Sequence, residues 1–231
     1  HAGREWIPVP PPAAAEYWAT RAAALPSPTI SPGWSTIGHW YGYDDLEWEG
    51  HLYGGKRSSF LGLLPLPSMS PQPFSIATDL ERDWGDYDDF IAVGWNLLST
   101  KIICHRVDDY LNFIRSSRGE IGIAKSGYLT SQCGWISDRS LVYLSLERPV
   151  LLQNTGWTEF VSPTQGLLPF HDAESARQQI EQVEDHYPAN CSAAAELARE
   201  MPVPQRVAAE RARELREVGV AKGEAYLASR V

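Results

Sequence analysis

The sequence contains no apolar run long enough to span a lipid bilayer as a helix. It also lacks the apolar core of a secretory signal peptide near its first residue. Cysteine is sparse, with 3 in 231 residues and no C-x-x-C pair, as in proteins whose thiols stay reduced. These absences predict a cytoplasmic location and no membrane span.

Basic residues are the minority charge: 20 Lys and Arg against 29 Asp and Glu give a formal net charge of −9. This balance argues against nucleic acid as the main partner, because a phosphate backbone favours a positive protein face. The P-loop, G-x-S-x-G and G-x-G-x-x-G motifs are all missing. The histidines and cysteines do not follow the spacing of zinc ligands. We therefore expect neither a nucleic-acid partner nor a bound metal ion.

The clearest structural signal lies in residues 120–156. Ile121 and Ile123 alternate with small residues, as in a short buried strand. Ser137 is a suitable helix N-cap, and residues 150–152 form a second apolar strand. A strand, a crossover helix and a strand make a parallel βαβ unit, which binds ligands outside the carboxyl ends of its strands. The polar loops of this segment fall at those ends, so a ligand site is predicted there.

The chain as a whole divides into three parts. Residues 1–33 are rich in Pro and Ala and are expected to be a lead-in or linker, with a short helix over 13–25. Strands alternate with helices through 34–200, which predicts a Rossmann-like α/β domain with a parallel sheet and helices on both faces. Further helices close the chain, and residues 201–231 are expected to form a helical tail.

Local patterns within the α/β domain predict individual elements. Strands are expected over 34–38 and 74–78, helices over 51–64 and 87–97, a short strand at Ile102 and Ile103, and a helix capped by Asp172.

The first candidate site is an anion cradle at the start of the helix after Gly134. Backbone N–H groups at a helix N-terminus bind phosphate oxygens, and Ser137, Arg139 and Ser140 would add side-chain donors. Lys125, at the end of the preceding strand, would bring a second cation to the same edge. The alternative is an ordinary capped helix whose arginine faces solvent.

Two further candidates follow strands. Gly38 and His39 come just after the first strand, where a glycine lets a ligand approach the backbone and a histidine can hydrogen-bond a sugar or phosphate. Gln153, Thr155 and Gly156 follow the last buried strand and offer amide and hydroxyl groups suited to polyol or nucleoside hydroxyls. The alternatives are a packed or surface histidine and a plain polar turn.

The fourth candidate is the acidic stretch around Asp86 and Asp88. A D-x-D spacing can hold a divalent cation between carboxylates. Acidic residues also suit the first turn of the helix expected there. The second interpretation is the simpler one, so no metal ligand is assigned.

Several segments together resemble the carboxyl-terminal half of bacterial GT-B glycosyltransferases. The similarity is specific over 114–170 and looser over the rest of 33–200. It rests on the stretches IRSSRGE (114–120), AK (124–125), GWISDRS (134–140), YL (143–144), RPV (148–150), QNTG (153–156) and GLLPF (166–170).

The resemblance implies an enzyme in which two Rossmann-like halves face each other across a cleft. The half that this chain matches would hold a nucleotide-sugar donor, such as a UDP-sugar, with no other cofactor and no metal. A missing amino-terminal domain would hold the acceptor, so the chain, which opens on His1 and not on Met, is expected to be a fragment. Carried over by position, the donor would contact Thr36, Gly38, His39, Lys125, Gly134, Ser137, Asp138, Arg139, Ser140, Gln153, Thr155 and Gly156.

The sequence departs from this family in its length, since only the donor half is matched, and in its acidic residues. Many retaining members carry two glutamates eight residues apart, and the matching positions in this chain are Gly134 and Val142. The stereochemistry of any transfer therefore stays open, and no catalytic residue is assigned. These departures support an alternative, a nucleotide- or partner-binding module derived from the same fold that does not turn over.

Overall fold

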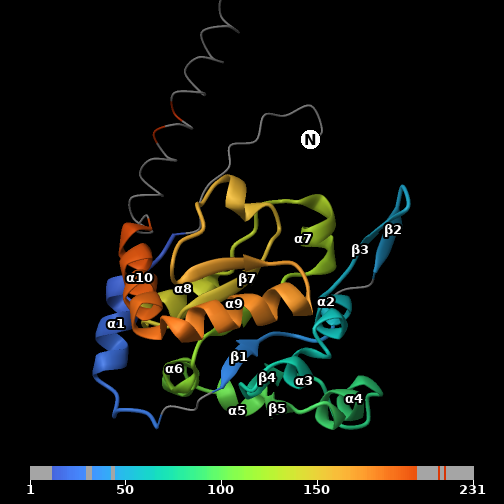
Figure 1. Ribbon diagram of the computed structural model, residues 1–231, viewed down its shortest axis with the longest axis horizontal. Coiled ribbons are helices and arrows are strands. Elements are labelled where there is room, and N and C mark those ends of the chain that lie inside the picture. Colours follow the sequence, from blue (N-terminus) through green and yellow to red (C-terminus); the bar gives the residue numbers. More distant parts are fainter. Residues whose placement is uncertain (1–11, 30–32, 43–44, 202–212, 214–215, 217–231) are drawn as a thin grey trace, which may run out of the picture.

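The computed structural model describes residues 12–29, 33–42, 45–201, 213 and 216. Residues 1–11 of the expected lead-in and most of the expected tail over 201–231 lie outside the described residues. Helix α1 (Ala15–Ala23) confirms the short helix expected over 13–25. It packs against α8 and α10, with Ala15 and Ala22 buried (Figure 1).

A six-stranded parallel sheet forms the centre of the molecule, with strand order β5-β4-β1-β6-β7-β8 (Figure 1). This is the strand order of a Rossmann fold, in which the chain runs outward from the middle of the sheet in both directions. The predicted Rossmann-like class is confirmed. The strands are β1 (Trp34–Ile37), β4 (Phe74–Thr78), β5 (Trp95–Ser99), β6 (Glu120–Gly122), β7 (Val150–Gln153) and β8 (Leu167–Phe170).

Helices cover both faces of the sheet, because alternate strand residues point to opposite sides and both sets are apolar. In β7, Val150 and Leu152 pack into one buried cluster and Leu151 into the other. The first face carries α1, α6 (Val107–Ser116), α8 (Asp138–Ser145) and α10 (Tyr187–Glu200). The second carries α2 (Arg57–Gly62), α3 (Leu66–Met69), α4 (Asp86–Ala92) and α9 (Ala173–Asp185), which crosses the front of the sheet in Figure 1.

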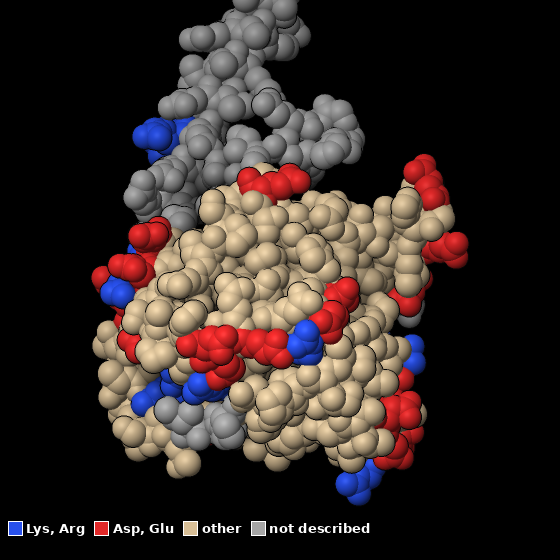
Figure 2. Space-filling view, in the orientation of Figure 1, with Lys and Arg blue, Asp and Glu red and all other residues tan. Residues whose placement is uncertain are grey.

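Helix α9 begins after Asp172, as expected. The Asp172 carboxylate accepts the Ser175 N–H at 2.8 Å and Ser175 Oγ accepts the Asp172 N–H at 3.0 Å, which forms a capping box. The outer face of α9 carries the ion pairs of Arg177 with Glu174 and Glu181, within the acidic stripe seen in Figure 2. None of the helices in the described part of the chain combines the length and apolarity that crossing a membrane demands.

The helix expected over 51–64 is wrong in its first part. Strands β2 (Leu46–Trp48) and β3 (His51–Tyr53) form a hairpin that projects from the body in Figure 1. Its two-residue turn holds Glu49 and Gly50 at φ values of 52° and 75°. A type I′ hairpin turn requires positive φ at both positions, as found here. The turn at Glu49 and Gly50 therefore sets the local structure, and the apolar pattern that predicted a helix does not. Helix α2 begins only at Arg57.

A second correction concerns residues 87–103. Helix α4 ends at Ala92, and the second part of the expected helix is the edge strand β5. Gly94, at a φ of 102° that other residues avoid, separates the two elements. Ile102 and Ile103 lie in the short helix α5 (Thr100–Ile103) and not in a strand. The strands expected over 34–38 and 74–78 are confirmed by β1 and β4.

Candidate functional site

The topological switch point of the sheet lies between β1 and β6, which pair through Ser35 and Glu120. From β1 the chain crosses to β4 on one side, whereas β6 begins the run toward β7 on the other. Open α/β sheets bind ligands in the crevice outside the carboxyl ends of such a strand pair. The cationic side chains of Lys56, Lys125 and Arg139 act on one another at this edge.

Arg139, in the first turn of α8, lies just below the rim. Its Nε donates to Glu120 Oε1 at 2.5 Å, and its Nη1 donates to the Ile37 carbonyl at the end of β1. The Glu120 side chain is fully buried and that of Arg139 is 12% exposed. Burial opposes the charge of the guanidinium, but the attraction of Glu120 outweighs it and raises the pKa of Arg139. The pair thus fastens α8 to both central strands, and Arg139 does not face solvent.

Lys56 reaches the same edge from the loop between β3 and α2. A Cβ added to Gly38 would lie 3.2 Å from Lys56 Nζ, and the Nζ lies 5.8 Å from the centroid of the Trp135 ring. No carboxylate among the described residues forms an ion pair with this amine. Desolvation, followed by repulsion from Arg139, holds the pKa of Lys56 well below its usual range.

An ion pair of the next residue, Arg57, holds the start of α2 in place. Arg57 donates from Nε and Nη2 to Asp86 at 2.7 Å each, and Trp40 Nε1 donates to the same carboxylate at 2.8 Å. Trp40 is fully buried and stacks on Phe60 of α2. The hydrogen bond from Arg57 is the main cause that lowers the pKa of Asp86. These contacts lock β1, α2 and α4 together.

The start of helix α7 (Ser126–Ser131) is closed by the loop that carries Lys56. The Ser126 N–H donates to the Gly55 carbonyl at 2.9 Å. This helix start therefore binds the loop, and its N–H group at Ser126 is not available to a ligand. Lys125 immediately precedes α7 and adds to the positive field around Lys56.

The first turn of α8 holds the other residues of the predicted anion cradle. Ser137 is the buried N-cap residue, but its side chain makes no capping hydrogen bond. Asp138 is exposed, and its Oδ1 accepts the Arg139 N–H at 2.9 Å. Buried polar atoms without a partner are rare in proteins and point to a missing water, ion or ligand group. Buried atoms with no partner among the described residues include Thr36 Oγ1 in β1, Glu120 Oε2 in β6, and Arg139 Nη2 and Ser140 Oγ in the first turn of α8.

The candidate ligand-binding residues that follow β7 make hydrogen bonds to the backbone of neighbouring loops. Gln153 Oε1 accepts a backbone N–H just after β6 at 3.1 Å, and Thr155 Oγ1 donates to a carbonyl in the loop before α8 at 2.8 Å. Gly134 and Gly156 have φ values of 73° and 87°, which L side chains rarely adopt. Gln153 also lines a small cavity of about 230 Å³ at the carboxyl ends of β7 and β8.

His39 lies just beyond β1, with its side chain 78% exposed. Its Nδ1 is 2.9 Å from Asp79 Oδ2, and Asp79 Oδ1 accepts the Trp40 N–H at 2.7 Å. Partial burial acts to raise the pKa of Asp79, but these hydrogen bonds outweigh it and the pKa is lowered. Gly38, the residue before His39, gives Lys56 its close approach to the end of β1.

The D-x-D pattern does not form a carboxylate cluster. Asp86 is engaged by Arg57 and Trp40, and Asp88 is exposed in the first turn of α4. Within the described ranges, no three His, Cys, Asp or Glu side chains gather as metal ligands would. Acidic residues at the start of a helix account for the pattern.

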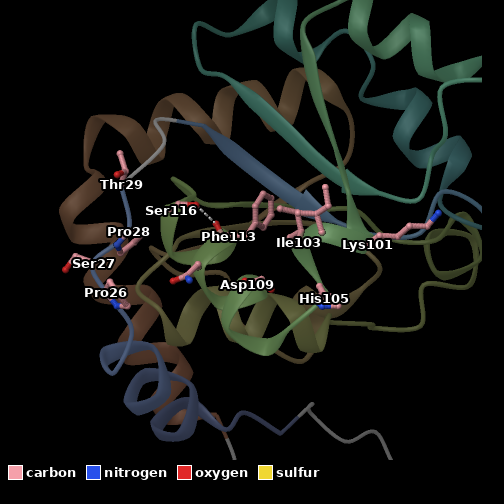
Figure 3. Close-up of a pocket in the computed structure, with 12 residues that line it drawn as sticks. Pro26, Ser27, Pro28, Thr29, Lys101, Ile103, His105, Asp109, Phe113 and Ser116 are labelled. Atoms are coloured by element: carbon pink, nitrogen blue, oxygen red, sulfur yellow. Dashed lines mark hydrogen bonds between the residues drawn. The ribbon is translucent and has the colours of Figure 1, made fainter.

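The largest of the described cavities, about 750 Å³, is lined by none of the switch-point residues. It is an open groove between the segment 26–29 and helices α5 and α6 (Figure 3). Ile103 and Phe113 provide apolar surface, and Asp109 lies on the α6 side. No sequence pattern pointed to this groove.

Sequence reasoning missed two residues of the switch point. Lys56 fell inside a stretch interpreted as a helix, although the preceding Gly54 and Gly55 are a signal for a loop. Glu120 falls in a short strand that is wholly buried, where a carboxylate requires a cationic or hydrogen-bonding partner. That requirement was the available signal for the pair with Arg139.

Comparison with known proteins adds no family assignment. A scan against protein-family models gives no match, and a search of curated proteins gives none either. The function therefore has to be argued from the site itself.

Proposed function

We propose that this chain is the donor-binding half of a glycosyltransferase, which transfers a sugar from a nucleotide-sugar to an acceptor and stabilises the diphosphate without a metal. The observation that carries the proposal is the meeting of Lys56, Lys125 and the first turn of α8 at the switch point of a Rossmann-like sheet. The resemblance of residues 114–170 to GT-B enzymes supports it.

The chemistry of glycosyl transfer explains why such an edge is suitable. As the bond between the sugar and the diphosphate breaks, negative charge develops on the leaving phosphate oxygens. Fixed positive groups aimed at that charge lower the barrier, by about 2–4 kcal/mol for one good donor. The N-terminus of α8 supplies a partial positive charge. Because the charge of Arg139 is balanced by Glu120, we assign the direct contact with phosphate to Lys56.

A nucleotide-binding module without turnover is the second candidate. The positions where many retaining GT-B enzymes carry paired glutamates hold Gly134, which has a positive φ, and Val142, which is buried in the core. Neither position offers a carboxylate to a bound sugar. A module that retained the diphosphate edge and lost the catalytic groups would have this combination.

Calorimetry of the full chain with UDP and GDP tests the shared part of both candidates. Lys56→Met removes the charge at similar volume, and Lys101→Met, at a lysine that is 80% exposed, is the matched control. A hydrogen bond to a charged group is worth about 1.5–3 kcal/mol, so K56M should weaken binding by at least about tenfold. K101M should bind as the natural chain does. Failure of the natural chain to bind either nucleotide would refute the proposal.

Turnover separates the transferase from the module. The full chain is incubated with UDP-glucose or GDP-mannose, and release of the free nucleoside diphosphate is followed by phosphorus NMR. Hydrolysis that is lost in K56M and kept in K101M favours the transferase. Nucleotide binding with no release from either sugar donor favours the module.

A further inference from the structure

The amine of Lys56 is half-buried and lies near several charged groups, none of which forms an ion pair with it. From α8 it faces Arg139 and Asp138, from β6 it faces Glu120, and Lys125 acts on it from the residue before α7. Glu120 is already engaged by Arg139 at 2.5 Å. Asp138 is exposed and accepts a backbone N–H of its own helix. A protonated Lys56 would therefore be the third cation in a group that holds two carboxylates.

The other neighbours supply no counter-charge. Asp45 Oδ1 accepts the Gly55 N–H at 3.3 Å, and Arg57 is turned toward Asp86. The Lys56 Nζ lies 5.8 Å from the centroid of the Trp135 ring, and its side chain runs beside Gly38, close to Phe60. An ammonium in this position is partly shielded from solvent and forms no ion pair with a carboxylate of the described residues.

We propose that Lys56 makes this site selective for ligand charge: the amine is neutral in the empty site and takes up a proton when a diphosphate binds beside it. The inference rests on the proposed function, because it concerns the same site. The proton comes from solvent, so a neutral amine, a proton and the anionic ligand become an ammonium paired with that anion. No covalent bond is made or broken.

The charge of the ligand and the pH should both affect how tightly this site binds. A bound anion opposes both causes that keep the pKa of Lys56 low, the desolvation and the repulsion from Arg139. A free nucleoside diphosphate carries about one more negative charge than the same diphosphate attached to a sugar. The site therefore prefers the leaving group to the intact donor, and the affinity for both falls as the pH rises above the pKa of Lys56 in the complex.

Calorimetry in two buffers with different heats of ionisation measures the proton directly. The full chain is titrated with UDP and with GDP in HEPES and in Tris above about pH 7.5, where a terminal phosphate is already ionised. The difference in heat should correspond to an uptake approaching one proton for each bound nucleotide. Lys56→Arg, with a permanent charge, should bind without this uptake, whereas Lys101→Arg, at a lysine that is 80% exposed, should keep it.

The outcomes separate this inference from the proposed function. Binding by the natural chain with equal heats in both buffers overturns the inference and leaves the proposed function standing. Absence of binding for both nucleotides overturns the two together.

A second measurement needs no ligand and no variant. Acetylation of Lys56 and of the exposed Lys101 in the full chain is followed against pH by peptide mass spectrometry. Lys56 should reach half of its maximal reactivity at a clearly lower pH than Lys101. Equal midpoints for the two lysines overturn the inference whatever the nucleotides do.

Discussion

The two sides of the switch point use a cation in opposite ways. On the α8 side, Arg139 is buried against Glu120 and the Ile37 carbonyl, so its charge is balanced where it lies. On the α2 side, Lys56 reaches the same edge without an ion pair to any described carboxylate. The first arrangement holds the central strands to a helix. The second leaves an amine that can take up a proton when an anion from outside the chain binds beside it.

The choice of side chain suits each task. The planar guanidinium of Arg139 presents several donors at once and serves a carboxylate and a carbonyl together. The ammonium of Lys56 is a compact charge whose pKa shifts readily on burial, so its ionisation can respond to a ligand. Substitutions on either side of the switch point should therefore differ in the size and the sign of their effects.

Arg139→Ala should cause the largest loss. It leaves Glu120 fully buried without its ion-pair partner, and breaking a buried pair on one side costs about 3–5 kcal/mol of unfolding free energy. Urea unfolding at neutral pH measures this. The double variant Arg139→Met with Glu120→Gln should recover much of the loss, since no charge is then left unpaired. A loss of unfolding free energy below about 1 kcal/mol for R139A would contradict this expectation, because it would equal the contribution of an ordinary surface salt bridge.

Asp86→Asn should destabilise less, by about 2 kcal/mol, because it weakens the bonds from Arg57 and from the buried Trp40 indole. The Asp86 pKa is lower in the folded chain than in the unfolded one. Its contribution is therefore complete above the unfolded pKa and disappears as the pH falls through the folded value. Unfolding measured from neutral to acid pH should show this increment in the natural chain and not in D86N, with Asp88→Asn as an exposed control.

Lys56→Met should have the opposite sign from the first two changes. The pKa of Lys56 is lower folded than unfolded, so the unfolded chain binds more protons between the two values. The stability of the ligand-free natural chain therefore gains from this group as the pH rises through that interval. K56M should lack this rise and be more stable at neutral pH, by on the order of 1 kcal/mol. A less stable K56M at neutral pH would mean that Lys56 is a structural cation like Arg139.

Gly38→Ala should have the smallest effect. The added methyl would lie 3.2 Å from Lys56 Nζ, at the end of a flexible side chain that can move aside. We expect a change in unfolding free energy below about 1 kcal/mol and a few-fold loss of UDP affinity by calorimetry, because Lys56 is displaced from the rim. Unchanged affinity would show that the position of Lys56 over β1 does not matter for binding.

Strand β7, in the interior of the sheet, was predictable from the sequence because it is apolar on both faces, whereas the edge strand β5 was predicted as the end of a helix. Residues 150–152 carry that signal without interruption, and the capped start of α9 at Asp172 follows from local chemistry alone. The hairpin at residues 46–53 was not predicted, since its register depends on the turn at Glu49 and Gly50 and not on hydrophobic period.

The candidate site was predictable only on one side. The helix start at Ser137–Ser140 could be inferred from the strand, loop and helix that surround it. Lys56 could not, because it lies 69 residues away in the chain from Lys125 and meets that edge only through the packing of β1, α2 and α4. The pairing of Arg139 with Glu120 likewise depends on the order of strands in the sheet.

A structure of the full chain with bound UDP or GDP tests the central claim most directly. We expect diphosphate oxygens within hydrogen-bond distance of Lys56 Nζ and of the first turn of α8. A nucleotide found instead in the groove between segment 26–29 and helices α5 and α6, with the switch point unliganded, would contradict it.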